Sequence, residues 1–104
     1  MNTFSDREKA YEAKYAHDEE MAFRANARRN KLLGLWAAEM LGKTGDAAQA
    51  YALEVVKSDF VEAGHEDVLR KVAGDLGAAA SLEDIRAMHG SLLSVAKAQL
   101  VGEV

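Results

Sequence analysis

The tripeptide Gly42-Lys43-Thr44 has residue types that bind nucleotide phosphates, which raises the question of a phosphate-binding loop. Such a loop needs a second glycine, separated from Gly42 by four residues, and it lies between a buried strand and a helix. The corresponding position is Ala37, and residues 31–41 are rich in Leu, Ala, Met and Glu, which favour a helix. We therefore interpret the tripeptide as part of a turn between two helices, the second of which is capped by Asp46.

Nucleophilic catalysis needs a nucleophile, a base and a group that orients the base. The three histidines, His17, His65 and His89, are far apart in the sequence, and there is no cysteine. The serines between residues 81 and 94 have the spacing of a helix cap and of helix-surface positions. The sequence therefore predicts a protein that is not an enzyme and that uses no cofactor.

The segment His17-Asp18-Glu19-Glu20 is the closest approach to a metal-binding cluster. Successive residues of a helix point about 100° apart, so these side chains do not converge on one ion. We expect a solvated acidic turn and no metal site. A histidine beside three carboxylates can also change its charge near neutral pH, so His17 is a candidate for pH control of docking by this part of the chain.

A basic face is predicted from Arg24, Arg28 and Lys31, which are spaced four and three residues apart. Such a face can bind an acidic protein surface or the phosphates of a nucleotide or nucleic acid, or it can be solvated, with Glu20 paired to Arg24. No aromatic residue alternates with these cations, which disfavours binding to single-stranded nucleic acid. The net charge of −4 is also unlike that of a general nucleic-acid binder, so among the functional interpretations we favour protein docking.

The composition indicates one helical domain. The chain has 104 residues, a sequence rich in alanine and charged residues, no proline and no cysteine. This favours helices, and the length supports one modest core. No apolar run is long enough to span a bilayer, and the first residues lack the order of a secretory signal. We expect a cytoplasmic protein without membrane insertion.

Four helices are predicted from turn residues and apolar spacing. Their expected limits are Ser5 or Asp6 to Leu41, Asp46 to Ala63, His65 to Ala79, and Ser81 to about Val101. The expected apolar stripes of the last three are Leu53, Val56, Phe60 and Ala63; Val68, Leu69, Val72 and Leu76; and Ile85, Met88, Leu92, Val95 and Ala96. Short connections predict antiparallel neighbours in a four-helix bundle.

The predicted helices contain an anchor residue, a capping pair and two internal glycines. Trp36 is expected to anchor the first helix in the core, because it is the largest apolar side chain. Ser81 and Asp84 are expected to cap the last helix. Gly34 and Gly90 lie inside helices, where each glycine either permits a close helix approach or is a tolerated surface residue.

The first helix is uneven in character. Residues 1–19 are rich in charged residues and have few large apolar side chains, whereas residues 20–104 contain the apolar stripes. A charge-rich, weakly apolar segment cannot offset the conformational entropy that it loses on ordering. We therefore predict an all-α fold, with a mobile, partly helical N-terminal segment (residues 1–19) and a helical bundle domain (residues 20–104). The segment is expected to fold against a partner.

Four stretches of the sequence together resemble a known family. They are Phe4–Lys9, Glu12–Met21, Arg28–Gly45 and Tyr51–Val72, of which Arg28–Gly45 is the most specific. The sequence resembles the zeta-subunit family, the ATPase inhibitor proteins of alpha-proteobacterial ATP synthases, over essentially its full length.

This resemblance implies a mechanism. Members of the family are four-helix proteins whose N-terminal region enters the catalytic head of the rotary ATP synthase, at a catalytic α/β interface beside the central stalk. The region forms a helix there and blocks rotation driven by hydrolysis, while synthesis is largely spared and the bundle docks on the outside. The resemblance also implies a cytoplasmic location, peripheral to the inner membrane through the ATP synthase, and a weak contact with ATP or ADP that cannot be assigned to residues.

By the same match, the inhibitory stretch falls on residues 1–19. The resemblance implies apolar anchors at Phe4, Tyr11 and Tyr15. The remaining members of the expected protein-binding set are charged or titratable: Asp6, Arg7, Glu8, Lys9, Glu12, Lys14, His17, Arg24 and Arg28. Little apolar content precedes Phe4, which leaves the depth of insertion open.

Two other functions remain open at this point. A small nucleotide-sensing helical bundle without catalytic activity would bind ATP or ADP on the bundle. A nucleic-acid accessory protein would use Arg24, Arg28, Arg29 and Lys31, and its binding would depend steeply on salt. We prefer the inhibitor, with the α, β and central-stalk subunits as partners and without a nucleic-acid partner.

Overall fold

The computed structural model describes the backbone of residues 3–59 and 64–103, and the side chains of residues 17–59 and 64–103. This part of the chain contains four α-helices and no strand. The helices are α1 (Thr3–Met40), α2 (Gly45–Ser58), α3 (Glu66–Leu76) and α4 (Leu82–Glu103), with a short 3₁₀ helix, η1 (Gly77–Ala79), before α4. The predicted all-α fold with four helices is confirmed.

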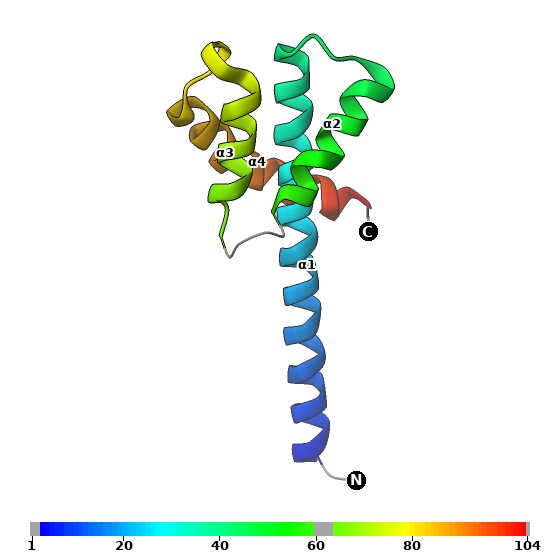
Figure 1. Ribbon diagram of the computed structural model, residues 1–104. Helices are drawn as coiled ribbons and strands as arrows, with labels where there is room; N and C mark the ends of the chain where they lie inside the picture. Colours follow the sequence, from blue (N-terminus) through cyan, green and yellow to red (C-terminus); the bar gives the residue numbers. More distant parts are fainter. Residues whose placement is uncertain (1–2, 60–63, 104) are drawn as a thin grey trace.

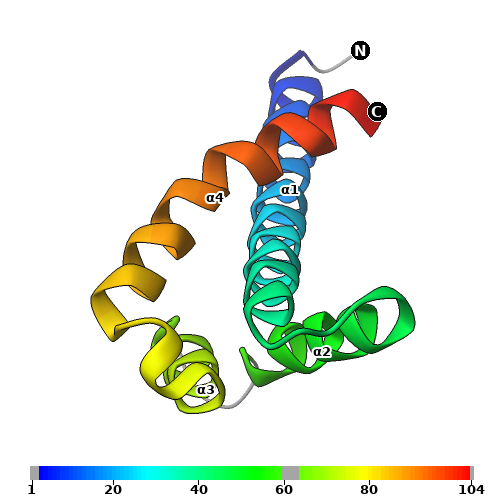
Figure 2. The same ribbon diagram turned by 90° about the horizontal axis from the view of Figure 1, so that it is seen from above.

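The helix α1 is the axis of the molecule. Its C-terminal half packs against the other helices, and its N-terminal half projects beyond them (Figure 1). The chain reverses direction after α1 and again after α2, and α4 then passes behind α1, as the view from above shows (Figure 2). The molecule is therefore elongated, with extents of 64 × 26 × 20 Å. No helix in the described ranges is both long and apolar enough to cross a membrane.

The limits of the first two helices differ from the predicted ones. Ser5 and Asp6 were expected to cap α1, but the helix begins at Thr3 and includes both. Asp46 was expected to cap α2, but Thr44 occupies the capping position and Asp46 lies in the first turn. There its carboxylate is close to the positive end of the helix dipole, which is a favourable place for a negative charge.

The turn between α1 and α2 uses its backbone to close the end of α1. Gly42 has a φ of 74°, and the amides of Gly42 and Lys43 donate to the carbonyls of Glu39 and Ala38 over 3.1 and 2.9 Å. This is the Schellman arrangement that ends many helices, and it needs a residue without a Cβ in the left-handed conformation. The amides that a phosphate-binding loop would offer to a ligand are occupied, which confirms that the Gly-Lys-Thr tripeptide is a turn.

The core confirms one predicted stripe and corrects another. Val68, Leu69, Val72 and Leu76 of α3 are all buried, as predicted. In α2, Leu53 was expected to be buried but is 52% exposed, and Val56 is only partly buried. The buried residues of α2 are Tyr51, Ala52 and Val55. The prediction was wrong because α2 packs the adjacent face, with Ala52 and Val55, against Gly34 of α1. The other two residues of the expected stripe, Phe60 and Ala63, lie outside the described ranges.

The fourth helix follows its predicted start and part of its predicted stripe. The amide of Asp84 donates to the Ser81 hydroxyl over 3.1 Å, and the amide of Ser81 donates to the Asp84 carboxylate over 3.3 Å, so the predicted cap is confirmed. Ile85 and Ala96 are buried, and Met88 and Leu92 pack against the core. Val95 was expected in the stripe but is 43% exposed, because it points about 100° away from Ala96, which with Leu100 belongs to the buried face of α4.

The contact between α1 and α2 depends on Gly34. A Cβ atom at this position would lie 2.7 Å from the Cα atom of Ala52, a backbone atom that cannot move aside without shifting α2. Gly34 therefore permits a close approach of α1 and α2, which was one of the two roles predicted for it. At Gly90 no atom lies within 4 Å of the corresponding position, so that glycine is a surface residue. Trp36 packs against the edge of the core and is only partly buried.

We expect Gly34→Ala to destabilise the fold and Gly90→Ala to stabilise it. The first substitution forces α1 and α2 apart, at a cost of about 1–3 kcal/mol. The second gains about 0.5–1 kcal/mol, because alanine loses less conformational entropy than glycine in a helix. Urea unfolding monitored by circular dichroism measures both, and equal changes for the two variants would contradict the packing described for Gly34.

Candidate protein-interaction site

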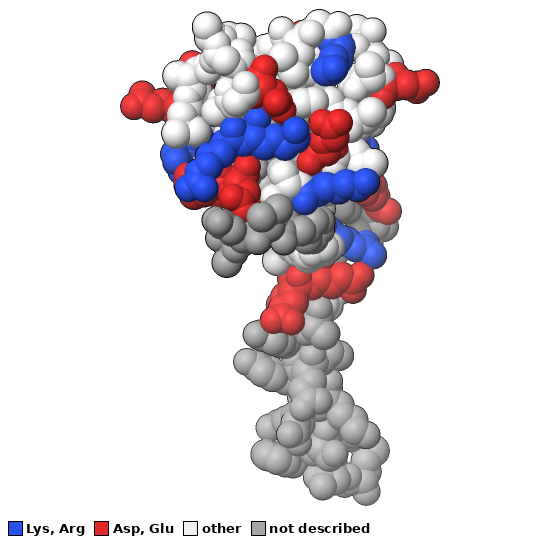
Figure 3. Space-filling view, viewed as in Figure 1, with Lys and Arg blue, Asp and Glu red and all other residues white. Residues whose placement is uncertain are grey.

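The N-terminal half of α1 is the largest part of the molecule that the other helices leave uncovered (Figure 1). The predicted binding residues from Phe4 to Tyr15 fall within its backbone, and their side chains lie outside the described set. Beyond them, His17, Asp18, Glu19 and Glu20 are exposed on the same helix. Figure 3 shows acidic side chains grouped where α1 leaves the bundle, while basic and acidic side chains alternate over the bundle itself.

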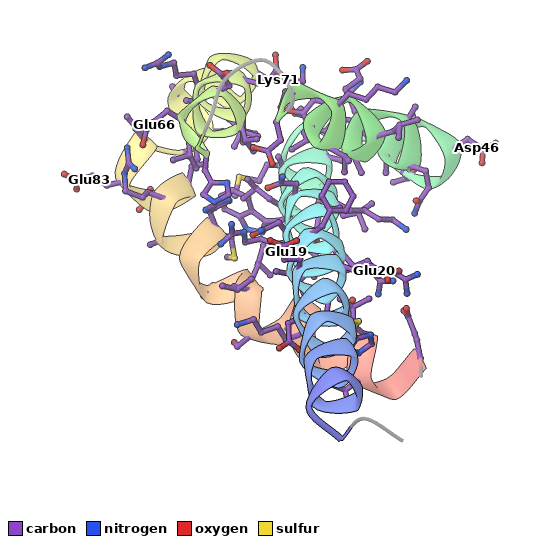
Figure 4. The ribbon with its side chains drawn as sticks, turned by 90° about the horizontal axis from the view of Figure 1, so that it is seen from below. Glu19, Glu20, Asp46, Glu66, Lys71 and Glu83 are labelled. Carbon is purple, nitrogen blue, oxygen red and sulfur yellow. The ribbon has the colours of Figure 1, made fainter. Side chains whose placement is uncertain are left out.

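Arg24 and Arg28, the last two predicted binding residues, have different environments. Arg24 pairs with Glu20 over 2.9 Å, and both side chains are 57% exposed, so this pair has the arrangement of a solvated helix face. Figure 4 shows Glu20 directed away from the bundle. Arg28 instead contacts α4: its guanidinium lies 2.7 Å from Glu103 and donates to Gln99 over 3.0 Å. Arg28 therefore also holds the end of α4 against α1.

The Arg28–Glu103 pair shifts the pKa of both groups. The hydrogen bond to Glu103 raises the pKa of Arg28, and the hydrogen bond from Arg28 lowers the pKa of Glu103. Each partner thus favours the charged form of the other. The pair remains ionised throughout the neutral range and joins the first helix to the last.

Arg29 belongs to a buried polar cluster that was not predicted from the sequence. It was assigned to the basic face in the nucleic-acid alternative, but its side chain points inward and only 6% of the residue is exposed. Its guanidinium donates to Asn26 over 2.8 Å and to the Nε2 atom of His65 over 2.9 Å. A guanidinium can only donate, so His65 accepts at Nε2 and its proton is on Nδ1. The Nδ1 atom lies 3.7 Å from the carboxylate of Asp59.

His89 completes this cluster from α4. Its ring centroid lies 5.0 Å from that of His65, and the residue is 6% exposed. Burial lowers the pKa of His89 to about 4, and the nearby positive charges of Arg29 and Arg86 act in the same direction. His89 is therefore neutral at physiological pH. The cluster joins α1, the connection between α2 and α3, and α4 at one point.

The position of Arg29 in the sequence contains a signal that reveals its burial. Ala25, Leu33 and Ala37 are buried and follow each other at multiples of four residues, and Arg29 occupies the place between the first two. A stripe drawn through these residues places Arg29 on the core face. Its charge and the neighbouring cations Arg28 and Lys31 had suggested a solvent-facing position instead.

A second polar network joins α2 to α3. The hydroxyl of Tyr51 donates to Asp75 over 2.8 Å, and Lys71 lies 3.1 Å from Asp75 and 3.5 Å from Glu54. Figure 4 places Lys71 between these two helices. Burial and the Asp75 carboxylate raise the pKa of Tyr51, so its hydroxyl remains protonated and acts as a donor. On the other side of α3, Arg86 of α4 binds Glu66 with two hydrogen bonds of 2.7 and 3.2 Å.

These arrangements stabilise the fold and offer no catalytic geometry. The described serines donate to backbone carbonyls one turn earlier or cap a helix, and no histidine lies within hydrogen-bond reach of them. Across the side chains that the structure describes, no three His, Asp or Glu residues converge to hold a metal ion.

Comparison with known proteins covers most of the chain. The family model described as ATPase inhibitor subunit zeta matches residues 1–99. A solved structure, described as a solution NMR structure, is 62% identical in sequence and superposes with a TM-score of 0.77; the match covers 81% of this chain and 99% of that chain. No curated protein was found to match the sequence.

His89 is expected to make the protein less stable in acid. Its pKa is about 4 in the folded protein and about 6.5 in the unfolded chain, so the unfolded chain binds more protons between these values. The free energy of unfolding therefore falls as the pH drops below 6.5 and levels off, for this group, below about 4. Between pH 7 and 5 the loss due to His89 is about 1–2 kcal/mol.

Urea unfolding of His89→Leu at pH 7 and pH 5 measures this effect. The variant is expected to lose about 1–2 kcal/mol less than the wild-type protein over this interval. The exposed His17 provides the control, because His17→Leu removes a histidine and leaves the buried cluster intact. An equal pH dependence of the wild-type protein and His89→Leu would show that His89 is not buried in its neutral form.

Proposed function

Because the chain belongs to the ATPase inhibitor subunit zeta family, we propose that it inhibits the rotary ATP synthase with its N-terminal segment. In this proposal, residues 1–19 bind at a catalytic α/β interface of the catalytic head, beside the central stalk. The bound helix prevents the closed interface from opening, so the rotor cannot take its next step in the direction of hydrolysis. The protein carries out no catalysis itself.

The observation that carries this proposal is the length of α1 beyond the bundle. A helix of 38 residues begins at Thr3, and the first of its described buried residues is Ala25. At 1.5 Å per residue, the backbone between these two residues extends about 33 Å. The end of α4 lies beside this helix from Asp18 onward. The part before Asp18 extends about 22 Å, which is long enough to enter a cleft between two large subunits while the bundle remains outside.

The residues proposed to contact the enzyme follow from helical spacing. Phe4, Tyr11 and Tyr15 are seven and four residues apart and so share one face of α1. Aromatic side chains are frequent energetic anchors of protein interfaces. The charged residues from Asp6 to Lys14, with His17, are proposed to pair with groups at the rim of the cleft. If this segment is mobile before it binds, ordering it consumes about 2–5 kcal/mol of the interaction energy.

The proposal also places the protein in the cell. It acts in the cytoplasm, at the inner membrane only through the ATP synthase, and its partners are the α, β and central-stalk subunits. Weak binding of ATP or ADP remains a prediction without assigned residues. The Gly-Lys-Thr tripeptide does not support such binding, since its amides close the end of α1.

Deletion of residues 1–19 is expected to abolish inhibition while the bundle stays folded. The buried residues that the structure describes all lie at Ala25 or later, so the core is retained. Titration of the full-length and truncated chains into the isolated catalytic head, with ATP hydrolysis as the readout, measures the effect. Circular dichroism and an NMR spectrum verify that the truncated chain is folded. Full inhibition by the truncated chain would contradict the proposal.

A single substitution in the complete chain provides a sharper version of the same test. Tyr11→Ala is expected to raise the concentration needed for half inhibition at least tenfold, since loss of an interface anchor costs about 2 kcal/mol. Leu82→Ala is the control, because Leu82 is 44% exposed at the start of α4, away from α1's N-terminal half. Equal potency of the two variants would exclude Tyr11 as an anchor.

A further inference from the structure

The bundle has an apolar groove that the proposed inhibitory segment does not use. It lies where α1, α2 and the end of α4 meet, and it has a volume of about 470 Å³. Its apolar surface comes from Phe23, Leu53, Val56 and Leu100. Phe23 is 61% exposed and Leu53 is 52% exposed, although both are large apolar residues. A second hollow of about 290 Å³ shares Leu53 and Val56 and extends the groove along α2.

Exposed apolar side chains that gather in one place usually mark a binding surface. Packing of α2 against α1 does not need Leu53, because the helix already buries Ala52 and Val55 on the adjacent face. The helix thus has two apolar faces, one packed on α1 and one facing solvent beside Phe23. The second face indicates a function other than folding.

The edge of the groove carries positive charge. Arg24, Arg28 and Lys31 line it on the α1 side, and Glu103 is the anionic residue among the side chains described there. Arg28 is paired with Glu103, and Arg24 with Glu20, while Lys31 is exposed. The groove lining is therefore locally positive on a protein whose net charge is −4. Within a Debye length of about 8 Å, these local charges decide which partner is attracted.

The secondary structure around the groove limits what can bind there. The described chain offers helix surfaces and no strand edge, so a partner cannot add a strand by backbone pairing. Recognition must use side chains, as when an amphipathic helix lies in a groove between helices. The three cations are spaced about one turn apart on α1, over about 10 Å. Carboxylates at a similar spacing on a parallel or antiparallel helix would match them.

We propose that this groove is a second protein-binding surface, which takes an amphipathic acidic helix of a partner protein. The partner's apolar stripe contacts Phe23 and Leu53, and its carboxylates lie beside Arg24 and Lys31. This surface is separate from residues 1–19, and binding to it does not require that the N-terminal segment acts on an ATPase. In a complex that engages both, the groove would add contacts outside the cleft that receives α1.

A synthetic amphipathic helix with a leucine stripe and flanking glutamates provides the probe. It is titrated into the ¹⁵N-labelled full-length chain, and a matched peptide with lysine in place of each glutamate is titrated in parallel. Chemical-shift changes are expected at residues that line the groove, with the acidic peptide only. The proposal is overturned by the absence of shifts up to about 1 mM peptide, by shifts centred elsewhere, or by equal binding of the lysine peptide.

Two substitutions and two matched controls identify the contacts. Leu53→Asp and Lys31→Glu are each expected to weaken binding of the acidic peptide at least tenfold. Leu82→Asp and Lys57→Glu make the same chemical changes at exposed positions outside the groove and are expected to leave binding unchanged. Wild-type affinity in both groove variants would refute the proposal. Groove signals that move with the concentration of the chain alone would assign the surface to a second copy and would also refute it.

The same variants separate this proposal from the proposed inhibition. If the wild-type chain does not inhibit the catalytic head but the acidic peptide binds the groove with the expected specificity, the inhibition is wrong and the groove remains. If the chain inhibits but the peptide does not bind, the groove proposal fails alone. All four substitutions are at exposed residues, and the wild-type NMR pattern verifies that each variant is folded.

Discussion

The absence of a side chain at Gly34 allows α2 to lie directly on α1, so that Ala52 and Val55 contact the backbone of the first helix. The rest of the arrangement follows from this contact. Because α2 is held close, α3 can reach the same stretch of α1 after a short connection, and α4 can pass on the other side. The small size of the molecule makes the contact more important, since a domain of this length has few core residues. A helix pair separated by an additional methyl group would lose packing along its whole length.

Hydrogen bonds explain how the protein tolerates a charged residue in its interior. Arg29 lies on the core face of α1, and burying a guanidinium is costly unless it is hydrogen-bonded. Asn26 and His65 each accept a hydrogen bond from it. These hydrogen bonds partly offset the cost of burying the guanidinium. The cluster also links α1 to the connection before α3 and to His89 of α4. Apolar residues in place of this cluster would join α1, the connection before α3 and α4 by contacts without a preferred direction. The hydrogen bonds of the cluster are directional and therefore fix the relative orientation of these segments.

Much of the fold could be predicted from the sequence, since helix ends and regular stripes depend on local chemistry. The turn at Gly42, the cap formed by Ser81 and Asp84, and the buried stripe of α3 belong to this group. The buried face of α2 could not be predicted in the same way. Its two faces are both apolar, and the choice between them is made by Gly34, which belongs to another helix.

The candidate site shows the same division between local and tertiary information. The uncovered N-terminal half of α1 was expected from its charged, weakly apolar composition, and the pair between Glu20 and Arg24 from their spacing. Three cations close together suggested one face, whereas Arg28 binds α4 and Arg29 is buried. The position of α4 gives Arg28 its partner, whereas the spacing of Ala25, Leu33 and Ala37 places Arg29 on the core face of α1. The groove beside Phe23 likewise requires three helices and could not be read from one of them.

Because α1 is one uninterrupted helix, the bundle limits how far its N-terminal tip can enter a cleft. A helix without proline or a break does not bend easily, so once α1 is ordered in a cleft its tip keeps a fixed distance from the bundle. The distance from Thr3 to Asp18, where the end of α4 first lies beside α1, is about 22 Å along the axis. This distance sets the farthest point that the tip can reach once the bundle rests on another surface. Adding or removing one turn, about 5.4 Å, in the part of α1 before Asp18 would move that point by the same amount and leave the contacts between α1 and α4 unchanged.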